Sequence, residues 1–142
     1  MGFLDSFKAR PRGFRAEAQP EGLPPFALWV HPRETEARLT QAVVRDGTFE
    51  PFETRLVQRL LPHFDMFLDL SVGVGWCTMI AQRVMNAGSE IHAFEPDREN
   101  FILLKLNAAS ERRVPTRLTR AAVTDEAGSA RLYLFADGVW RT

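Results

Sequence analysis

The residues best suited to chemistry lie in one short stretch, residues 69–75 (DLSVGVG), and in Glu95, twenty residues further along the chain. Small residues at 71, 73 and 75 allow a tight strand-to-helix turn and let the backbone approach a ligand closely. The helix that follows would offer free N–H groups and a positive dipole end. An acidic residue at the position of Glu95, at the end of the next strand, can accept hydrogen bonds from both hydroxyls of a ribose. This combination predicts a site for a nucleoside-containing cofactor; the alternative is a glycine turn that serves strand–helix packing alone.

The residues after the turn distinguish between two classes of such cofactors. A dinucleotide site needs a third glycine three residues after the second, where the helix lies close beneath the pyrophosphate. Thr78 or Trp76 occupies that position, depending on which small residues are counted. Asp69 adds a negative charge, which suits the ammonium group of an amino-acid moiety better than a phosphate. The residues therefore point to S-adenosylmethionine and disfavour a nicotinamide-dependent oxidoreductase.

Alternating strands and helices are predicted around this turn, from apolar runs, helical periodicity and turn residues. In chain order, the expected elements are helices over 33–44 and 52–61, a strand over 66–70, a helix over 76–87, a strand over 91–94, a helix over 98–109, a strand over 117–123 and an antiparallel return strand over 131–135. Asp97 is the expected N-cap of the 98–109 helix. The 52–61 helix is expected to bury an apolar stripe made of Phe52, Leu56, Val57, Leu60 and Leu61.

This order of elements predicts an α/β protein with a doubly wound, mostly parallel, Rossmann-like sheet. Residues 1–25 are expected to form an N-terminal arm, 26–64 a helical lead-in, and 65–142 the Rossmann-like domain. The domain is interpreted as incomplete, truncated after its third strand and a hairpin. An exposed sheet edge and an uncovered apolar face predict self-association, or a partner chain that completes the sheet.

Several motifs together resemble the FkbM-type S-adenosylmethionine-dependent methyltransferases, over about residues 47–135. They are the turn at 69–75, the strand end at 92–97 (HAFEPD), the helix at 100–107 with its late asparagine, and the segment at 121–128 (AAVTDEAG). Residues 47–51 (GTFEP) are similar to the segment that precedes the first strand in this family. Two positions depart from the pattern: Ser71 stands where the family has glycine, and Gly73 where it has asparagine.

The resemblance implies a class I methyltransferase fold and transfer of a methyl group from S-adenosylmethionine to an oxygen, often on a sugar or a natural product. It also implies a set of cofactor-binding residues. Asp69, Gly73 and Gly75 would line the methionine end, and Glu50 would contact the same moiety. Glu95 would hold the ribose, and Ala122 and Val123 would flank the adenine region. Ser71 and Pro96 complete the expected cofactor-binding set. The acceptor is expected to be a small molecule or a glycan, and no catalytic base can be named from the sequence.

A second function remains open: a non-catalytic partner-binding or assembly module that retains the methyltransferase fold. Ser71 favours it, because a serine Cβ could crowd the cofactor or shift the turn. The apparent absence of the second half of the sheet also favours it.

Composition and charge exclude several other classes of protein. The chain has 142 residues, of which 45% are hydrophobic and 25% charged, as expected of one soluble domain. Its 18 basic and 18 acidic residues balance, so no overall field attracts nucleic acid. No metal-ligand spacing links the three histidines, and the single cysteine, Cys77, is interpreted as a packing residue. Without a secretory signal or an apolar run long enough for a membrane span, the sequence predicts a cytoplasmic protein.

Overall fold

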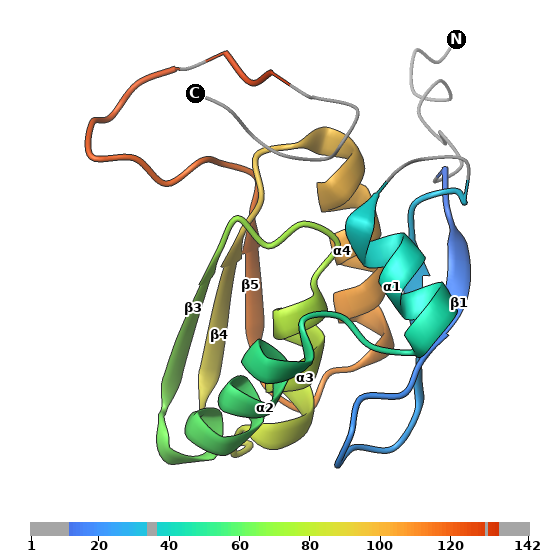
Figure 1. Ribbon diagram of the computed structural model, residues 1–142. Helices are drawn as coiled ribbons and strands as arrows, with labels where there is room; N and C mark the ends of the chain where they lie inside the picture. Colours follow the sequence, from blue (N-terminus) through green and yellow to red (C-terminus); the bar gives the residue numbers. More distant parts are fainter. Residues whose placement is uncertain (1–11, 34–36, 130, 134–142) are drawn as a thin grey trace, which may run out of the picture.

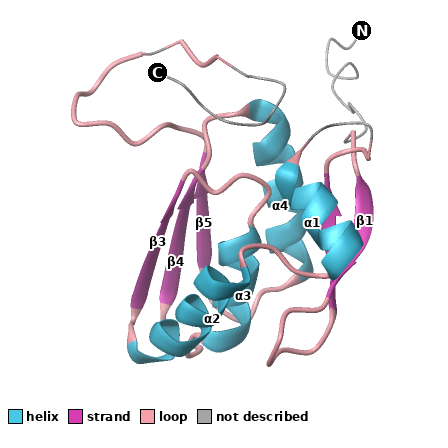
Figure 2. Cartoon of the chain, viewed as in Figure 1, coloured by secondary structure: helices cyan, strands magenta, loops and turns pink. Residues whose placement is uncertain are grey.

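The computed structural model of the chain describes residues 12–33, 37–129 and 131–133. Figures 1 and 2 show a parallel sheet, a layer of helices beside it, and a two-stranded hairpin on the far side of the helices. In chain order the elements are β1 (Phe14–Ala18), β2 (Phe26–Val30), α1 (Arg38–Asp46), α2 (Pro51–Leu60), the 3-10 turn η1 (Leu61–His63), β3 (Met66–Leu70), α3 (Trp76–Val84), β4 (Glu90–Phe94), α4 (Arg98–Ser110) and β5 (Thr116–Thr119).

The parallel sheet confirms the predicted α/β, Rossmann-like class. Its strands lie in the order β3-β4-β5, and the chain crosses through α3 and then α4 between them. Asp69 in β3 lies opposite Ala93 in β4, which places the ends of both strands at the same edge of the sheet. The glycine turn and Glu95 therefore meet at the carboxyl edge, where ligands bind in open α/β sheets.

Residues 12–30 differ from the prediction of an arm followed by a helical lead-in, and the rest of the predicted arm, residues 1–11, lies outside the described residues. Strands β1 and β2 pair as an antiparallel hairpin, with Phe14 opposite Val30. Their alternate side chains are buried, as Ala18, Leu28 and Val30 show at 0% exposure. The arm prediction is wrong for residues 14–18 because the proline- and arginine-rich composition hid a short alternating pattern. The predicted helix over 33–44 begins later, at Arg38 in α1.

The helices α3 and α4 form the middle layer of the molecule. On the hairpin side, Met79, Ile80 and Leu103 pack in one apolar cluster with the inward residues of β1 and β2. On the sheet side, Ala81 of α3 packs in a second cluster with Ile91 of β4. Since both sides of α3 are buried, the position of its N-terminus relative to β3 and β4 is set by packing.

The opposite face of the sheet is uncovered in the described part of the chain. Met66, Leu68 and Leu70 of β3 are 50%, 55% and 51% exposed, whereas Ile91 and Ala93 of β4, which face the helices, are fully buried. β3 is also an edge strand. The expected apolar face and open edge are therefore present, and the association that they predict stays a prediction.

The apolar stripe of α2 was predicted to be buried, and this is wrong for three of its residues. Phe52, Leu56 and Leu60 are 68%, 48% and 46% exposed. The helix packs on α3 through the side that carries Thr54 and Val57. Thr54 is buried and accepts a hydrogen bond of 2.8 Å from Nε1 of Trp76. Val57 packs in both apolar clusters, so polar and apolar contacts together orient α2.

The last predicted strands are shorter than expected or not seen. β5 ends at Thr119, so the prediction of a strand as far as Val123 is wrong for residues 120–123. Residues 131–133 form no strand, and the rest of the predicted return strand lies outside the described residues. Among the residues that the structure describes, no helix has the length and apolarity needed to cross a lipid bilayer.

Candidate cofactor site

The glycine turn bends through three residues with left-handed backbone conformations. Ser71, Gly73 and Gly75 have φ angles of 63°, 61° and 103°. At Gly75 a Cβ atom would lie 2.7 Å from Cδ1 of Leu104 in α4, and the φ of 103° also favours glycine. At Gly73 a Cβ atom would meet nothing within 4 Å. Asparagine, the residue of the FkbM-type pattern, is among the residues that best tolerate this conformation, so Gly73 is no obstacle to the turn.

The turn is held by contacts to β4 and α4. The N–H of Val72 donates to the carbonyl of Phe94 at 3.2 Å. The next N–H, of Gly73, donates to Oε2 of Glu95 at 2.6 Å. The carbonyl of Val74 accepts a bond of 2.7 Å from the side chain of Asn107. Each step of the turn is therefore tied to the neighbouring elements before any ligand binds.

Glu95 faces inward, to the protein backbone. Its side chain is fully buried, with Oε2 on the N–H of Gly73 and Oε1 accepting from the N–H of Asp97 at 2.9 Å. Asn100 Nδ2 also lies 3.4 Å from Oε1. Burial raises the pKa of Glu95 above its ordinary value, while these hydrogen bonds oppose the shift. In this conformation Glu95 closes the turn, and both oxygens have protein donors in place of ribose hydroxyls.

Asp69 lies at the opposite side of the turn, near the start of α3. Oδ2 of its half-buried carboxylate accepts a hydrogen bond of 2.6 Å from the hydroxyl of Thr78. Burial raises the pKa of Asp69, and the hydrogen bonds from Thr78 partly offset this. Thr78, which the sequence marked only as a missing glycine, is thus the residue that orients Asp69.

Carboxylates surround the first turn of α3. Burial, followed by the charges of Asp69, Glu50 and Glu53, raises the pKa of the Cys77 thiol to about 12. A thiol at a helix N-terminus normally has a lowered pKa, so the acidic neighbours and burial outweigh the helix dipole here. Cys77 is therefore an unreactive packing residue, and the electrostatic potential at the start of α3 is negative.

Trp76 connects this region to the core. Its ring is 3% exposed and packs against Phe26 and Phe49, with ring centroids 6.0 and 6.5 Å away. Nε1 donates to Thr54, whose hydroxyl donates to the carbonyl of Phe49 at 2.8 Å. These contacts place the exposed Glu50, which has a left-handed φ of 44°, at the start of α2 beside α3.

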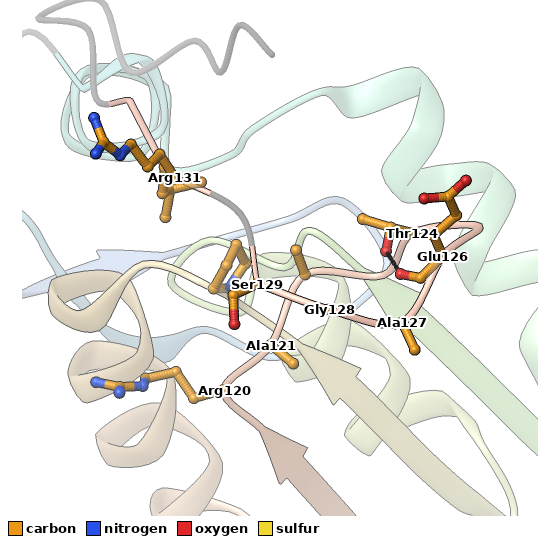
Figure 3. A pocket seen from close by; sticks show the side chains of 11 residues that line it. Arg120, Ala121, Thr124, Glu126, Ala127, Gly128, Ser129 and Arg131 are labelled. Carbon is orange, nitrogen blue, oxygen red and sulfur yellow. Dashed lines mark hydrogen bonds between the residues drawn. The ribbon is translucent and has the colours of Figure 1, made fainter.

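A cavity of about 620 Å³ lies beyond the ends of β4 and β5 (Figure 3). Of the expected cofactor-binding residues, Pro96 and Ala122 line it, whereas Val123 is 55% exposed and does not. Arg120 and Glu126 also line this cavity, and the sequence did not indicate them. The described residues of the turn itself, 69–75, do not contribute to its wall.

Asn107 and Asn100 are two more site residues to which the sequence gave no role. Asn107 is fully buried and bonds the turn at Val74. Its signal was the late asparagine of the FkbM-type resemblance, and a buried amide implies polar partners. Among the described residues, no group of three or more His, Cys, Asp or Glu side chains could hold a metal ion.

Comparison with known proteins points to methyltransferases. The chain is 34% identical over 73 residues to the 31-O-demethyl-FK506 methyltransferase FkbM of Streptomyces tacrolimicus; the match covers 51% of this chain and 27% of that protein. The chain therefore matches about a quarter of the length of this relative. A solved S-adenosylmethionine-dependent O-methyltransferase of Thermotoga maritima superposes with a TM-score of 0.45 at 13% identity, over 78% of this chain and 56% of that one. No family model matches the chain.

Proposed function

We propose that this chain forms the cofactor-binding part of an S-adenosylmethionine-dependent methyltransferase. The observation that carries the proposal is the charge and hydrogen bonding of the turn. The N–H of Gly73, which a phosphate would need, donates to Glu95, and the N–H of Gly75 donates to the carbonyl of Val72. With Asp69 and Glu50 also beside the start of α3, this region disfavours a pyrophosphate and suits a cationic group.

The residues present fit S-adenosylmethionine, which supplies an electrophilic methyl group on a sulfonium when bound. Asp69 and Glu50 would hold the ammonium of its methionine end, and the left-handed turn through Ser71, Gly73 and Gly75 would lie against it. The chain's contribution is to bind and orient, since methyl transfer depends mainly on the alignment of the reacting groups.

Glu95 is fully buried, so it would reach the ribose hydroxyls only after the turn shifts to expose its carboxylate. We propose that Glu95 then accepts hydrogen bonds from the ribose hydroxyls, with Pro96, Ala122 and Val123 at the ribose and adenine side. The cavity beside Pro96 and Ala122 supports this placement. We propose the hydroxyl of a small molecule or a glycan as the acceptor; the name of the relative, a 31-O-demethyl-FK506 methyltransferase, supports transfer to an oxygen.

The test is isothermal titration of the purified chain with S-adenosylmethionine, S-adenosylhomocysteine and NAD in parallel. We expect binding of both adenosyl ligands and none of NAD. Glu95→Ala should lose that binding, whereas Glu17→Ala, an exposed residue of the hairpin, should keep it. Binding of NAD alone, or unchanged affinity in Glu95→Ala, would contradict the proposal.

The alternative is a partner-binding module that retains the fold without a working cofactor site. The burial of Glu95, whose two oxygens each accept a hydrogen bond from a backbone N–H, favours it. Failure of the wild-type chain to bind any of the three ligands, in a folded state verified by circular dichroism, would support this alternative over the methyltransferase.

A further inference from the structure

Asn107 joins three segments that are far apart in the sequence. Its Oδ1 accepts a hydrogen bond of 2.7 Å from the N–H of Trp29 in β2. Its Nδ2 donates to the carbonyl of Trp29 at 2.9 Å and to the carbonyl of Val74 in the glycine turn at 2.7 Å. The side chain is 0% exposed, and both amide hydrogens and the amide oxygen have partners.

The contact with Val74 lies between Gly73 and Gly75, two residues of the turn with left-handed backbone conformations. Val74 directly precedes Gly75, where a Cβ would lie 2.7 Å from Leu104 of α4, the helix that carries Asn107. Because a buried amide with all its partners has only one favourable orientation, Asn107 sets the direction of the Val74 carbonyl. A displaced Val74 would move both Gly73 and Gly75, between which it lies.

We propose that Asn107 is a positioning residue for the cofactor turn, and that through it the hairpin strand β2 forms part of the support of the cofactor site. This inference rests on the proposed function for the nature of the ligand. The hydrogen bonds that carry it are present without any ligand. The hairpin thus has a role beyond covering α3 and α4. Trp29 of β2 orients the side-chain amide of Asn107, and this amide orients the Val74 carbonyl of the turn.

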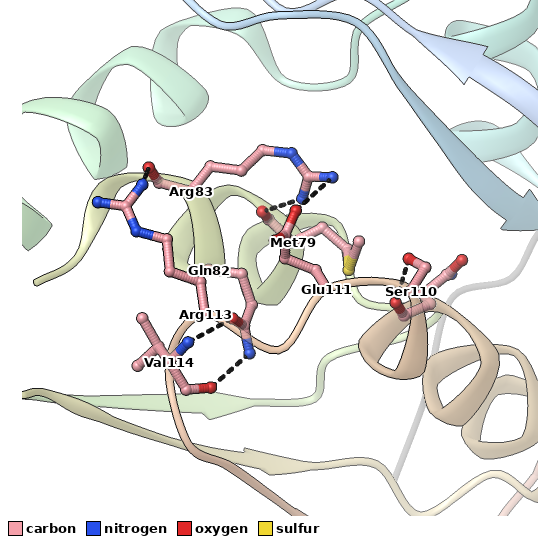
Figure 4. Close-up of polar contacts among 8 residues, drawn as sticks. Met79, Gln82, Arg83, Ser110, Glu111, Arg113 and Val114 are labelled. Carbon is pink, nitrogen blue, oxygen red and sulfur yellow. Dashed lines mark hydrogen bonds and ion pairs between the residues drawn. The ribbon is translucent and has the colours of Figure 1, made fainter. Parts of the chain in front are cut away.

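Gln82 provides a matched comparison elsewhere in the protein. This buried amide also pairs with both backbone groups of one residue, accepting from the N–H of Val114 at 2.9 Å and donating to its carbonyl at 2.8 Å (Figure 4). Its remaining contact is the hydroxyl of Thr116 in β5. Gln82 has no hydrogen bond to the turn, so its removal should affect stability alone.

The experiment compares Asn107→Ala with Gln82→Ala. Both variants should have lower melting temperatures, since each loses three buried hydrogen bonds. The dissociation constant for S-adenosylhomocysteine, measured well below both melting temperatures, should increase about five- to tenfold in Asn107→Ala and stay unchanged in Gln82→Ala. Equal affinities in the two folded variants would overturn the proposal, because a purely structural amide would behave like Gln82.

A measurement on the wild-type chain covers the case in which Asn107→Ala does not fold. Saturation with S-adenosylhomocysteine should shift the amide resonance of Trp29, which bonds to Asn107, together with those of the turn. The amide of Val114, bonded to Gln82, should not shift. Shifts in the turn without any at Trp29 would overturn the proposal.

Failure of the proposed function would give a different experimental result from failure of the positioning role. If the wild-type chain binds no S-adenosylhomocysteine, the methyltransferase assignment fails, and the positioning role is tested without ligand. Hydrogen exchange of the Gly73 and Gly75 amides should then be faster in Asn107→Ala than in Gln82→Ala. Equal exchange rates in the two variants would overturn the positioning role as well.

Discussion

The hydroxyl of Thr78 donates a hydrogen bond of 2.6 Å to the carboxylate of Asp69, across the start of α3. This bond satisfies the carboxylate only in part, because burial still raises the pKa of Asp69 above its ordinary value. The folded protein therefore holds a proton on Asp69 more tightly than the unfolded chain does. The contribution of Asp69 to stability consequently falls as pH rises from the ordinary pKa through the raised one, and is constant above it.

Asp69→Asn should remove this part of the pH dependence. The amide oxygen can still accept from Thr78, and no charge is buried. Denaturant unfolding between about pH 4 and pH 7 should show a smaller decrease in stability for Asp69→Asn than for the wild type. Asp125→Asn, which changes an exposed carboxylate by the same charge, is the control and should follow the wild type. An identical slope in Asp69→Asn and the wild type would contradict this prediction.

Ser71 has a backbone conformation that favours glycine, with φ at 63°. Relief of the left-handed conformation in Ser71→Gly is worth about 1 kcal/mol, and the greater freedom of glycine in the unfolded chain offsets about half of it. We expect the free energy of unfolding to increase by about 0.5 kcal/mol in Ser71→Gly and to stay nearly unchanged in Ser71→Ala, which keeps the Cβ of this exposed residue. Chemical denaturation measures both, and a Ser71→Gly variant less stable than Ser71→Ala would refute the strain at this position.

Cys77 should be nearly inert in the folded protein, because its thiol has a pKa of about 12. Alkylation by iodoacetamide at mildly alkaline pH should be at least about 100-fold slower than in the unfolded chain, since the thiolate is the reactive form. Glu50→Gln and Asp69→Asn should each accelerate it by removing a nearby negative charge. Glu17→Gln is the control. If neither substitution changes the rate, the electronegative environment that supports the cationic ligand is absent.

The uncovered sheet face should cause association between copies of the chain. Met66, Leu68 and Leu70 lie in an edge strand with half of each side chain in solvent, and like surfaces can pair about a two-fold axis. Analytical ultracentrifugation should show an average mass that increases with concentration. Leu68→Lys should reduce that increase, whereas Leu132→Lys, outside the sheet, should not. A wild-type monomer at all concentrations tested would rule out this association.

Elements with strong local signals could be predicted from the sequence. The strand at 66–70 was predicted from its apolar run and is present with these bounds as β3. The helix after Asp97 begins where expected, and Oδ1 of Asp97 accepts from the N–H of Asn100 at 2.8 Å as an N-cap. Such signals depend on residues within one or two turns of each other, so the chain need not be folded for them to be read.

The hairpin could not be predicted in the same way. Phe14 pairs with Val30, and both strands are held by contacts with α3 and α4, more than 40 residues later. Each strand has only five residues, and the burial that stabilises them depends on packing against helices that the local sequence does not specify.

By itself the sequence determined the order of strands and helices around the glycine turn and the types of side chain that meet at the carboxyl edge. Only the tertiary structure decided what those side chains do there. It directs Glu95 to Gly73, places Thr78 on Asp69, and brings Asn107 between Trp29 and Val74. A carboxylate or an amide can bond to any donor within reach, and which donor is within reach depends on how distant elements pack.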